Sequence, residues 1–268
     1  MSYSSVFREL HNGPGPLRLP NVWDAGSARI FEDLGAKAIA TTSAGVAWAL
    51  GYPDGNALPI GLLAGLTRNI TRVIHIPLSV DVEEGYSEDP NTVAKNVLAI
   101  AEAGAVGINI EDGLGDPDVL VTKIKEIKEE MTKAGIDLFI NARTDVYLQG
   151  LAAVEKSMDE TVRRALLYKK AGADGIFIPG LTDPHVVHTI VKEVSMPVNL
   201  MAWPGLLPAA ELGKIGVKRL SAGSGISQVL WQHAAQLAGD FLATGDSTPM
   251  SEGFMPYAKL QTLFAEKK

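Results

Sequence analysis

One short phrase recurs along this chain, and it constrains the fold more than any other feature. It occupies residues 31–39, 101–108 and 170–176, and a looser copy lies at 212–220. Each copy reads as the end of a helix, then a glycine, then an apolar stretch. A glycine at a helix end supplies a left-handed cap, and a short apolar stretch indicates a strand that is buried in a parallel sheet. The phrase therefore predicts a repeating β–α unit.

Eight such units follow one another, because eight apolar stretches alternate with amphipathic helical stretches along the chain. Eight successive units in 268 residues predict one α/β domain folded as a (β/α)8 barrel, or TIM barrel, whose parallel sheet closes on itself. An open, doubly wound sheet is the alternative, but it rarely needs eight units, and its glycine-rich nucleotide fingerprint is not found in this sequence. Strands are expected at residues 17–22, 36–42, 77–82, 106–110, 138–142, 175–179, 197–201 and 217–221, and helices at 27–34, 59–74, 91–103, 118–134, 158–171, 184–194, 208–214 and 226–244.

The domain is expected to consist of the barrel, residues 1–246, and a C-terminal helical tail, residues 247–268. The tail holds one short amphipathic helix, expected at 257–266, which lies outside the eight units. We expect this extra helix to pack on a neighbouring surface, either in the same chain or by exchange with a partner subunit.

Composition narrows the classes of partner and site. A net charge of −7 gives the chain no electrostatic reason to bind nucleic acid or an anionic membrane. The sequence has no cysteine, which excludes disulfides, thiolate metal sites and a cysteine nucleophile, and makes a reducing cytoplasm the expected compartment. The first residues lack the pattern of a signal peptide, and no run of about 18 apolar residues predicts a membrane span.

Carboxylates are over-represented where the predicted strands end, which is where the active sites of (β/α)8 barrels lie. Asp81 and Glu83 are two residues apart and would face the same way on an extended segment, and Glu111 ends the next strand. Three converging carboxylates repel unless a raised pKa, a basic partner or a divalent cation compensates. Oxygen ligands without His or Cys favour Mg²⁺ or Mn²⁺. The alternative is that they cap helices or pair with an arginine; helix capping is expected for Asp89 and Asp116, which each precede a proline.

Other strand-end residues suit an anionic substrate. Arg143 ends the fifth strand, where it could bind an anionic substrate or stabilise an enolate oxygen, pair structurally with Asp145 or Glu111, or do both. The loop after the second strand starts with the small residues 43–45, which let backbone N–H groups approach an anion or simply form a tight turn. The next turn carries another carboxylate, Asp54.

Together these motifs resemble the isocitrate lyase/phosphoenolpyruvate mutase superfamily over most of the chain. The order and spacing of six runs carry the resemblance. It implies a (β/α)8 barrel in dimers or tetramers that exchange a C-terminal helix. It also implies an enzyme that makes or breaks a C–C or P–C bond next to a carbonyl through a Mg²⁺-stabilised enolate. The six runs are residues 21–28, 42–47, 50–54, 79–86, 107–112 and 140–145.

The resemblance implies a role for each matching residue. Asp81 resembles the family's metal-proximal aspartate, Glu83 stands in the place of a second aspartate, and Arg143 resembles the substrate-binding arginine. The implied metal ligands are Asp81, Glu83 and Glu111; the implied substrate-binding residues are Ser43, Ala44, Gly45, Arg143 and Asn199; and the implied catalytic residues are Arg143, Asp54 and Glu111.

The sequence departs from the family in the loop after strand four, residues 112–122. Lyases of the family carry a Lys-Lys/Arg-Cys-Gly-His sequence there, and the mutase and hydrolase use a lysine and an asparagine, but this loop contains no Cys, Lys, His or Asn. Lys123 is the nearest lysine, and it looks like part of the following helix. A metal-bound water, Tyr52, Tyr86 or Asp112 could supply the proton instead.

These features favour a Mg²⁺-dependent lyase that acts on a small 2-oxo or 2-hydroxy carboxylate through a metal-stabilised enolate, by C–C cleavage or decarboxylation. Phosphonopyruvate hydrolysis or phosphoenolpyruvate mutase chemistry is one alternative. A non-catalytic 2-oxo acid-binding barrel is the other. A homodimer or homotetramer is expected.

Overall fold

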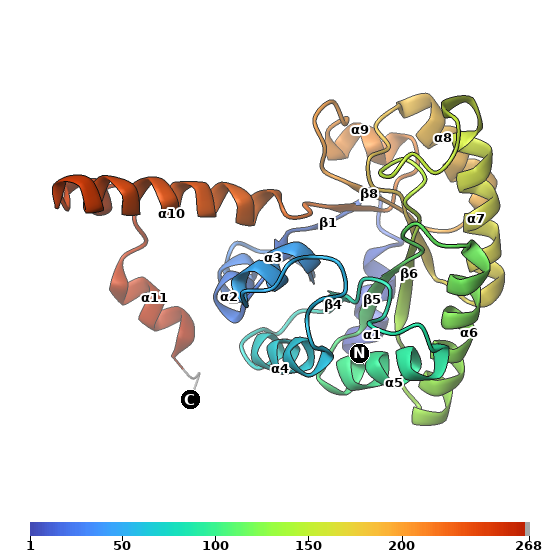
Figure 1. The fold of residues 1–268 in the computed structure, drawn as a ribbon, viewed down its shortest axis with the longest axis horizontal. Helices are drawn as coiled ribbons and strands as arrows, with labels where there is room; N and C mark the ends of the chain where they lie inside the picture. Colours follow the sequence, from blue (N-terminus) through green and yellow to red (C-terminus); the bar gives the residue numbers. More distant parts are fainter. Residues whose placement is uncertain (266–268) are drawn as a thin grey trace.

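Within residues 1–265, which the computed structural model describes, nine parallel strands form one curved sheet with helices on its outer side (Figure 1). The predicted TIM barrel is confirmed. The strands are β1 Leu17–Leu19, β2 Asn21–Val22, β3 Ile39–Thr41, β4 Leu78–Asp81, β5 Gly107–Glu111, β6 Phe139–Arg143, β7 Gly175–Phe177, β8 Val198–Met201 and β9 Arg219–Ser221. The helices are α1 Tyr3–Leu10, α2 Ala25–Asp33, α3 Ser43–Ala49, α4 Ile60–Thr71, α5 Pro90–Glu102, α6 Pro117–Ala134, α7 Ser157–Ala171, α8 Pro184–Val194, α9 Ala209–Lys214, α10 Gly225–Thr244 and α11 Tyr257–Phe264, with 3₁₀ turns at Val154–Lys156 and Thr248–Ser251.

The barrel closes across a strand that is interrupted at Pro20. The sheet order is β1-β9-β8-β7-β6-β5-β4-β3-β2, so the two ends of the sheet are the two halves of the first predicted strand. β1 pairs with β9, whereas β2 pairs with β3. Proline has no N–H to donate to a neighbouring strand, which explains why the strand predicted as continuous over 17–22 divides there. The two halves together fill one of eight positions around the barrel.

The recurring phrase forms the helix-to-strand junction that the sequence predicted. Its glycines, Gly35, Gly104, Gly172 and Gly216, all have positive φ angles. A residue without Cβ adopts this left-handed conformation at little cost, so each glycine ends one helix and lets the chain turn into the next strand.

Two carboxylates in the loops that follow β4 and β5 are helix caps, as expected. Asp89 precedes α5 and accepts the N–H of Thr92, and Asp116 precedes α6 and accepts the N–H of Asp118. A proline follows each aspartate in the first turn of its helix, where no N–H is needed. These two aspartates therefore belong to the scaffold.

Helix α1, which the repeating pattern did not predict, closes the N-terminal end of the barrel. Ser2 caps it by accepting the N–H of Ser5. The fully buried ring of Phe7 packs edge-on against Phe139, with 5.5 Å between the ring centroids, and a Cβ added at Gly107 would lie 2.8 Å from it. Phe139 and Gly107 begin β6 and β5, so α1 plugs the end opposite the strand C-termini.

Helix α10 leaves the barrel as a long arm, which corrects the packing expected for a barrel helix at 226–244 (Figure 1). Apart from Ser227, every residue of this helix is exposed. The tail then returns, because α11 buries Leu263 against α2 and Arg29 donates its Nε–H to the Leu263 carbonyl at 2.9 Å. The predicted end of this last helix at residue 266 lies outside the described residues. Among the helices of residues 1–265, none combines the length and apolar character needed to cross a membrane.

Candidate active site

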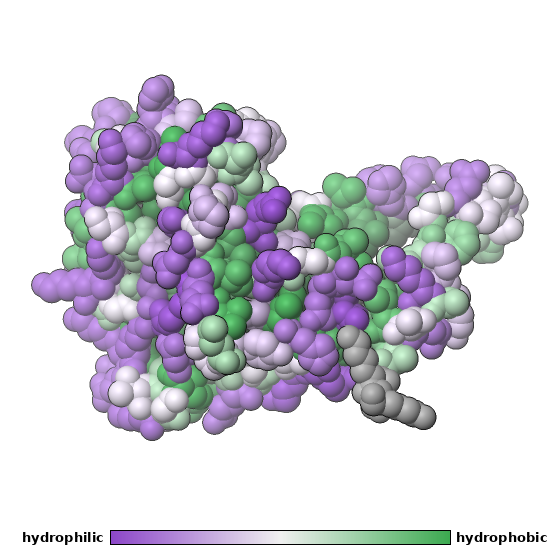
Figure 2. All heavy atoms as spheres, turned by 180° about the vertical axis from the view of Figure 1, so that it is seen from behind, coloured by the Kyte–Doolittle hydropathy of each residue, from purple (hydrophilic) through white to green (hydrophobic). Residues whose placement is uncertain are grey.

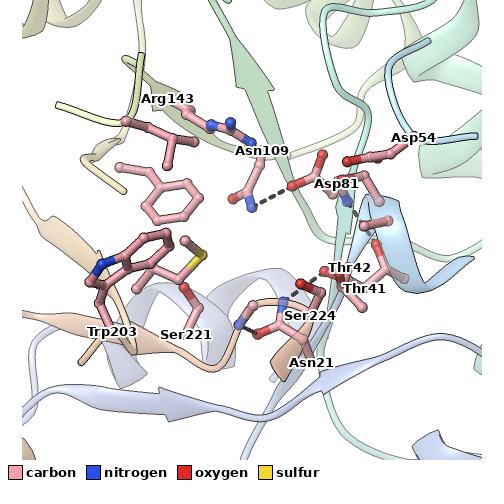
Figure 3. A pocket seen from close by; sticks show the side chains of 16 residues that line it. Asn21, Thr41, Thr42, Asp54, Asp81, Asn109, Arg143, Trp203, Ser221 and Ser224 are labelled. Carbon is pink, nitrogen blue, oxygen red and sulfur yellow. Dashed lines mark hydrogen bonds between the residues drawn. The ribbon is translucent and has the colours of Figure 1, made fainter. Parts of the chain in front are cut away.

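Two adjoining cavities lie at the C-terminal ends of the strands, the end of the barrel that α1 leaves open. Their volumes are about 200 and 230 Å³. Ser43, Asp54 and Arg143 line both of them, so the cavities share one boundary. Figure 3 shows the first cavity, with Asp54, Asp81 and Arg143 among the residues that line it. Of the predicted metal ligands, Asp81 lines the first cavity, and Glu83 and Glu111 line the second.

Asp81 ends β4 and is held by donors on both carboxylate oxygens. Asn109, its partner in the register of β4 with β5, donates from Nδ2 to Oδ2 at 3.1 Å, and the backbone N–H of Glu83 donates to Oδ1 at 3.1 Å. Burial raises the pKa of Asp81, whereas the charge of Arg143 lowers it. The carboxylate is thus oriented by the sheet but desolvated, a state that a nearby cation stabilises.

Glu83 lies near Asp81 for a different reason from the one expected. β4 ends at Asp81, and Glu83 has a φ angle of 50°, so the alternation of an extended strand does not apply. Its carboxylate accepts the hydroxyl proton of Tyr86 at 2.8 Å and the N–H of Asn56. Asn56 and Tyr86 also have positive φ angles, 59° and 58°. Such left-handed conformations of non-glycine residues cost about 1–3 kcal/mol each and cluster at functional sites. The backbone at Glu83, which lines the second cavity, is therefore strained.

Arg143 is fixed between two carboxylates. It stands opposite Glu111 in the register of β5 with β6, and its Nη1 lies 2.6 Å from Glu111 Oε2. Its Nε and Nη2 donate to the two oxygens of Asp145 at 2.7 and 2.9 Å. Burial raises the pKa of Glu111 well above its usual range, and the charge of Arg143 opposes this effect. Arg143 is therefore paired structurally and also lines both cavities, and its contact with a substrate stays a prediction.

Asp112 points away from the cavities, although it was one of the proton donors considered. Its wholly buried side chain accepts from Arg164 Nη1 at 2.8 Å, from the Tyr168 hydroxyl at 2.5 Å and from the backbone N–H of Asp145 at 3.0 Å. Successive residues at a strand end face opposite sides, so Glu111 faces the site while Asp112 faces α7. Asp112 is an anchor for the loop after β6.

Two other candidate proton carriers are also engaged elsewhere. The Tyr86 hydroxyl donates to Glu83, and Lys123, buried in α6, donates from Nζ to the backbone carbonyl of Glu84 at 2.8 Å. Helix α6 starts at Pro117, one residue before the helix predicted at 118–134, so the later part of the 112–122 segment is helical. Neither Lys123 nor Tyr86 lines a cavity.

The small-residue loop forms the first turn of helix α3, which the sequence analysis missed. Ser43 and Ala44 line the first cavity. Gly45 is buried behind them, where a Cβ would lie 2.6 Å from Cγ2 of Thr42 and 3.2 Å from Cβ of Trp23. The glycine is thus required for close packing of α3, and backbone contact of these three residues with a substrate stays a prediction.

Beneath the first cavity, the barrel interior contains a layer of polar side chains. Asn141 donates from Nδ2 to Asn109 Oδ1 at 2.9 Å and to Asn199 Oδ1 at 3.0 Å. Arg219, which is 1 % exposed, donates to Asn109 Oδ1 at 3.0 Å, and burial lowers its pKa to about 9. Asn199 lines neither cavity, so its predicted contact with substrate stays a prediction.

Asn109, Asn141 and Arg219 were not identified from the sequence, although the sequence holds a signal for them. In β5, polar or small residues alternate with Ile108 and Ile110, which are buried under the helices. Because strand residues alternate between faces, the polar set must face the barrel interior. Reading alternate residues on each strand would have found this layer.

The acidic residues fit a hard divalent cation that is bound through few protein ligands. Burial raises the pKa values of Asp81, Glu83 and Glu111, and a cation beside them would offset the cost of ionising them together. Within residues 1–265, no three His, Cys, Asp or Glu side chains are already gathered as a ligand cage. That arrangement is compatible with Mg²⁺, which commonly takes one or two protein carboxylates and keeps several waters.

Known proteins share both this sequence pattern and this fold. The family model described as phosphoenolpyruvate phosphomutase matches residues 7–242. An uncharacterized protein of Mycobacterium tuberculosis is 38 % identical over 259 residues, which cover 95 % of this chain and 94 % of that one. An oxaloacetate decarboxylase of Bradyrhizobium diazoefficiens is 30 % identical over 210 residues, covering 76 % and 72 %. The crystal structure of a Burkholderia cenocepacia protein provisionally named a phosphonomutase matches with a TM-score of 0.84 at 39 % identity, covering 88 % of this chain and 99 % of that one. The chain therefore belongs to the isocitrate lyase/phosphoenolpyruvate mutase superfamily of lyases and mutases.

Proposed function

We propose that this protein is a Mg²⁺-dependent lyase that acts on a small 2-oxo or 2-hydroxy carboxylate through an enolate, by C–C cleavage or decarboxylation. One observation carries the proposal: a single cation, Arg143, and two carboxylates, Asp54 and Asp81, line the same cavity of about 200 Å³. A guanidinium suits a substrate carboxylate, and the aspartates suit a hard cation. The decarboxylase name of one relative adds support for this reaction class.

Each residue has a task in this proposal. Arg143 binds the substrate carboxylate, and its bidentate pair with Asp145 sets the plane of the guanidinium. Glu111, whose pKa is raised by burial, is proposed to exchange a proton with the substrate. Asp54 lines both cavities, and we propose it as a second proton carrier, which moves a proton in the direction opposite to that of Glu111.

The residues proposed to hold Mg²⁺ are Asp81, Glu83 and Glu111, one or two of them directly and the others through the ion's waters, and Mn²⁺ could replace the ion. When bound, the ion supplies positive charge that stabilises an enolate oxygen. Ser43, Ala44 and Gly45 are proposed to hold the substrate's carboxylate or carbonyl from the other side of the cavity.

Oxalate, which mimics the enolate of pyruvate, tests the binding part of the proposal. We expect oxalate to raise the melting temperature only when Mg²⁺ is present, because the two bind together. Asp81→Asn should abolish this shift, whereas Asp33→Asn, an exposed change at the end of α2, should leave it unchanged. A shift of equal size without Mg²⁺, or in Asp81→Asn, would contradict the proposed site.

Turnover separates the three candidate functions. A lyase releases pyruvate and CO2 from oxaloacetate or cleaves a related acid, and Asp81→Asn should lower that rate at least a hundredfold. Phosphate release from phosphonopyruvate would favour P–C chemistry instead. Oxalate binding without turnover of any acid would favour a non-catalytic binding protein.

We further propose that two or more copies of the chain associate through α10. Val229, Leu230 and Leu242 on this arm are 60 %, 51 % and 85 % exposed, and Figure 2 shows apolar surface on the arm and on the adjoining side of the barrel. Beside β1 and α2 lies a groove of about 440 Å³, lined by Phe31 and Ile226 among others, where an eighth barrel helix would otherwise pack. A second copy's α10 supplies a helix of the right kind for that groove, and covering both surfaces removes apolar area from water.

A further inference from the structure

Asn109 is the residue of β5 that lines the first cavity. The sheet order places β5 between β4 and β6, which carry Asp81 and Arg143 at their ends, and both of these side chains line the same cavity. Glu111, two residues further along β5, lines the other cavity instead. A ligand that spans Asp81 and Arg143 must therefore cross β5 at Asn109.

The orientation of the Asn109 amide is fixed at both ends. Its Nδ2 donates to Oδ2 of Asp81 at 3.1 Å, drawn as a dashed line in Figure 3, and an ionised carboxylate can only accept. Its Oδ1 accepts from Nη2 of Arg219 at 3.0 Å, and a guanidinium can only donate. Asn141 donates to the same oxygen at 2.9 Å. Turning the amide over would break all three hydrogen bonds, so Nδ2 stays on the side of Asp81.

One of the two hydrogens on Asn109 Nδ2 is not used by the fold. The bond to Asp81 takes one hydrogen, and no group within residues 1–265 accepts the other. The side chain is 3 % exposed, and the first cavity is the space that it lines. A buried donor without an acceptor costs free energy, so an acceptor that a ligand brings into this cavity is favoured.

A buried charge lies directly behind this amide. Across residues 1–265, Nε and Nη1 of Arg219 have no hydrogen-bond partner, and Nη2 contacts only Asn109 and, at 3.5 Å, Ser79. Burial lowers the pKa of Arg219 to about 9, which leaves the side chain charged at neutral pH. A charged donor on Oδ1 polarises the amide and strengthens the hydrogen bonds that Nδ2 donates.

We propose, resting on the function proposed above, that Asn109 is a catalytic residue whose second amide hydrogen binds the enolate oxygen, and that Arg219 is a positioning residue that polarises this amide from behind. The amide donates a hydrogen bond and keeps its proton throughout. A donor that is already oriented stabilises negative charge as it develops, and stabilises a neutral carbonyl oxygen less. Asn109 thus acts together with the cation and Arg143.

Oxalate and pyruvate test the proposal by isothermal titration calorimetry with the full chain in excess Mg²⁺. Oxalate carries charge on the oxygen that mimics the enolate, whereas pyruvate has a neutral carbonyl there. Asn109→Leu should weaken oxalate about thirtyfold and pyruvate about fivefold, because a hydrogen bond to a charged acceptor is the stronger one. Both ligands need the metal, so weaker Mg²⁺ binding would affect both alike. The ratio of the two dissociation constants therefore reports the hydrogen bond, and an unchanged ratio would overturn the proposal.

Variants of Arg219 test whether its charge acts through the amide. Arg219→Met should reduce the preference for oxalate about two- to threefold, whereas Arg219→Lys, which keeps a charged donor, should restore most of it. In the Asn109→Leu background, Arg219→Met should cause no further loss, because the amide that transmits its effect is gone. Equal losses in both backgrounds would show that Arg219 acts independently of Asn109 and would overturn its assigned role.

Two matched controls lie outside both cavities. Asn69→Leu is an exposed change on α4, and Arg8→Met removes another guanidinium whose carbon lies near an aromatic ring, 5.5 Å from the centroid of Phe139. Neither should change the ratio of the dissociation constants. Should Asn109→Leu not fold, as judged by circular dichroism, the ratio in Arg219→Met decides, and no change there would overturn the proposal.

The wild-type chain distinguishes failure of this inference from failure of the proposed function. If neither oxalate nor pyruvate binds the wild-type chain in excess Mg²⁺, the proposed function falls and this inference falls with it. If both bind, and Asn109→Leu weakens them by the same factor, only the inference is overturned.

Discussion

Replacing Asp112 by asparagine distinguishes a structural anchor from a proton donor. The side chain is 0 % exposed and accepts three hydrogen bonds, from Arg164, Tyr168 and the backbone of Asp145. An asparagine at this position would keep the shape but lose the charge, and its amide nitrogen would offer a donor where at least one donor already points. The structure therefore predicts that Asp112→Asn acts mainly on stability.

The expected magnitude follows from the ion pair with Arg164. Removing one partner of a buried pair costs about 3–5 kcal/mol, because the remaining charge is left without compensation. Arg164 keeps a second partner, because its Nε lies 2.6 Å from Oε1 of Glu160, whose side chain is 22 % exposed. This remaining ion pair favours the lower end of that range. A loss of about 3 kcal/mol corresponds to a fall in melting temperature of roughly 6–12 °C for a chain of this size.

Urea unfolding followed by far-ultraviolet circular dichroism measures this loss, and the oxalate assay reports on the site. Asp33→Asn makes the same chemical change at an exposed position and should alter the free energy of unfolding by no more than about 0.5 kcal/mol. A loss below about 1 kcal/mol in Asp112→Asn, together with abolished turnover and intact oxalate binding, would refute the structural role and restore Asp112 as a proton donor.

Two further predictions concern the barrel's closed end and the α10 arm. Burial lowers the pKa of His11 from 6.5 to about 4. Between pH 6.5 and 4 the folded chain therefore binds fewer protons than the unfolded chain, and the free energy of unfolding should fall by about 3 kcal/mol as the pH drops through this range. His11→Phe keeps the stacking on Phe139 and should remove that part of the pH dependence of urea unfolding; an unchanged slope would contradict the assignment. Leu230→Asp on α10 should reduce the mass measured by light scattering to that of one chain, whereas Val154→Asp, at another exposed site, should not; a wild-type monomer would contradict the proposed association.

The barrel was predictable from the sequence because each β–α junction is decided locally. A glycine with a positive φ angle and the apolar run that follows it, as at Gly104 and Gly172, are sufficient to mark one junction. The departure of α10 was not predictable in this way. Its apolar residues, such as Leu230 and Trp231, indicate burial, but the surface that buries them is a matter of tertiary or quaternary packing. Helix α1 was missed because it stands outside the repeat that organised the prediction.

The acidic site was predictable in outline but not in its geometry. The rule that barrel active sites lie at strand C-termini identified Asp81, Glu111 and Arg143, and the structure brings all three to the two cavities. The position of Glu83 depends on a left-handed turn, which a non-glycine residue rarely adopts and no local pattern indicated. Asp112 was misjudged because it follows Glu111, and adjacent residues on a strand serve opposite faces.

The same alternation places acidic and apolar side chains around the first cavity. Phe177 and Met201 occupy the same inward face of their strands as Asp81 and Arg143, at equivalent strand ends. The barrel thus places acidic and apolar groups around one cavity by the same rule, and only the identity of each strand's last inward residue differs.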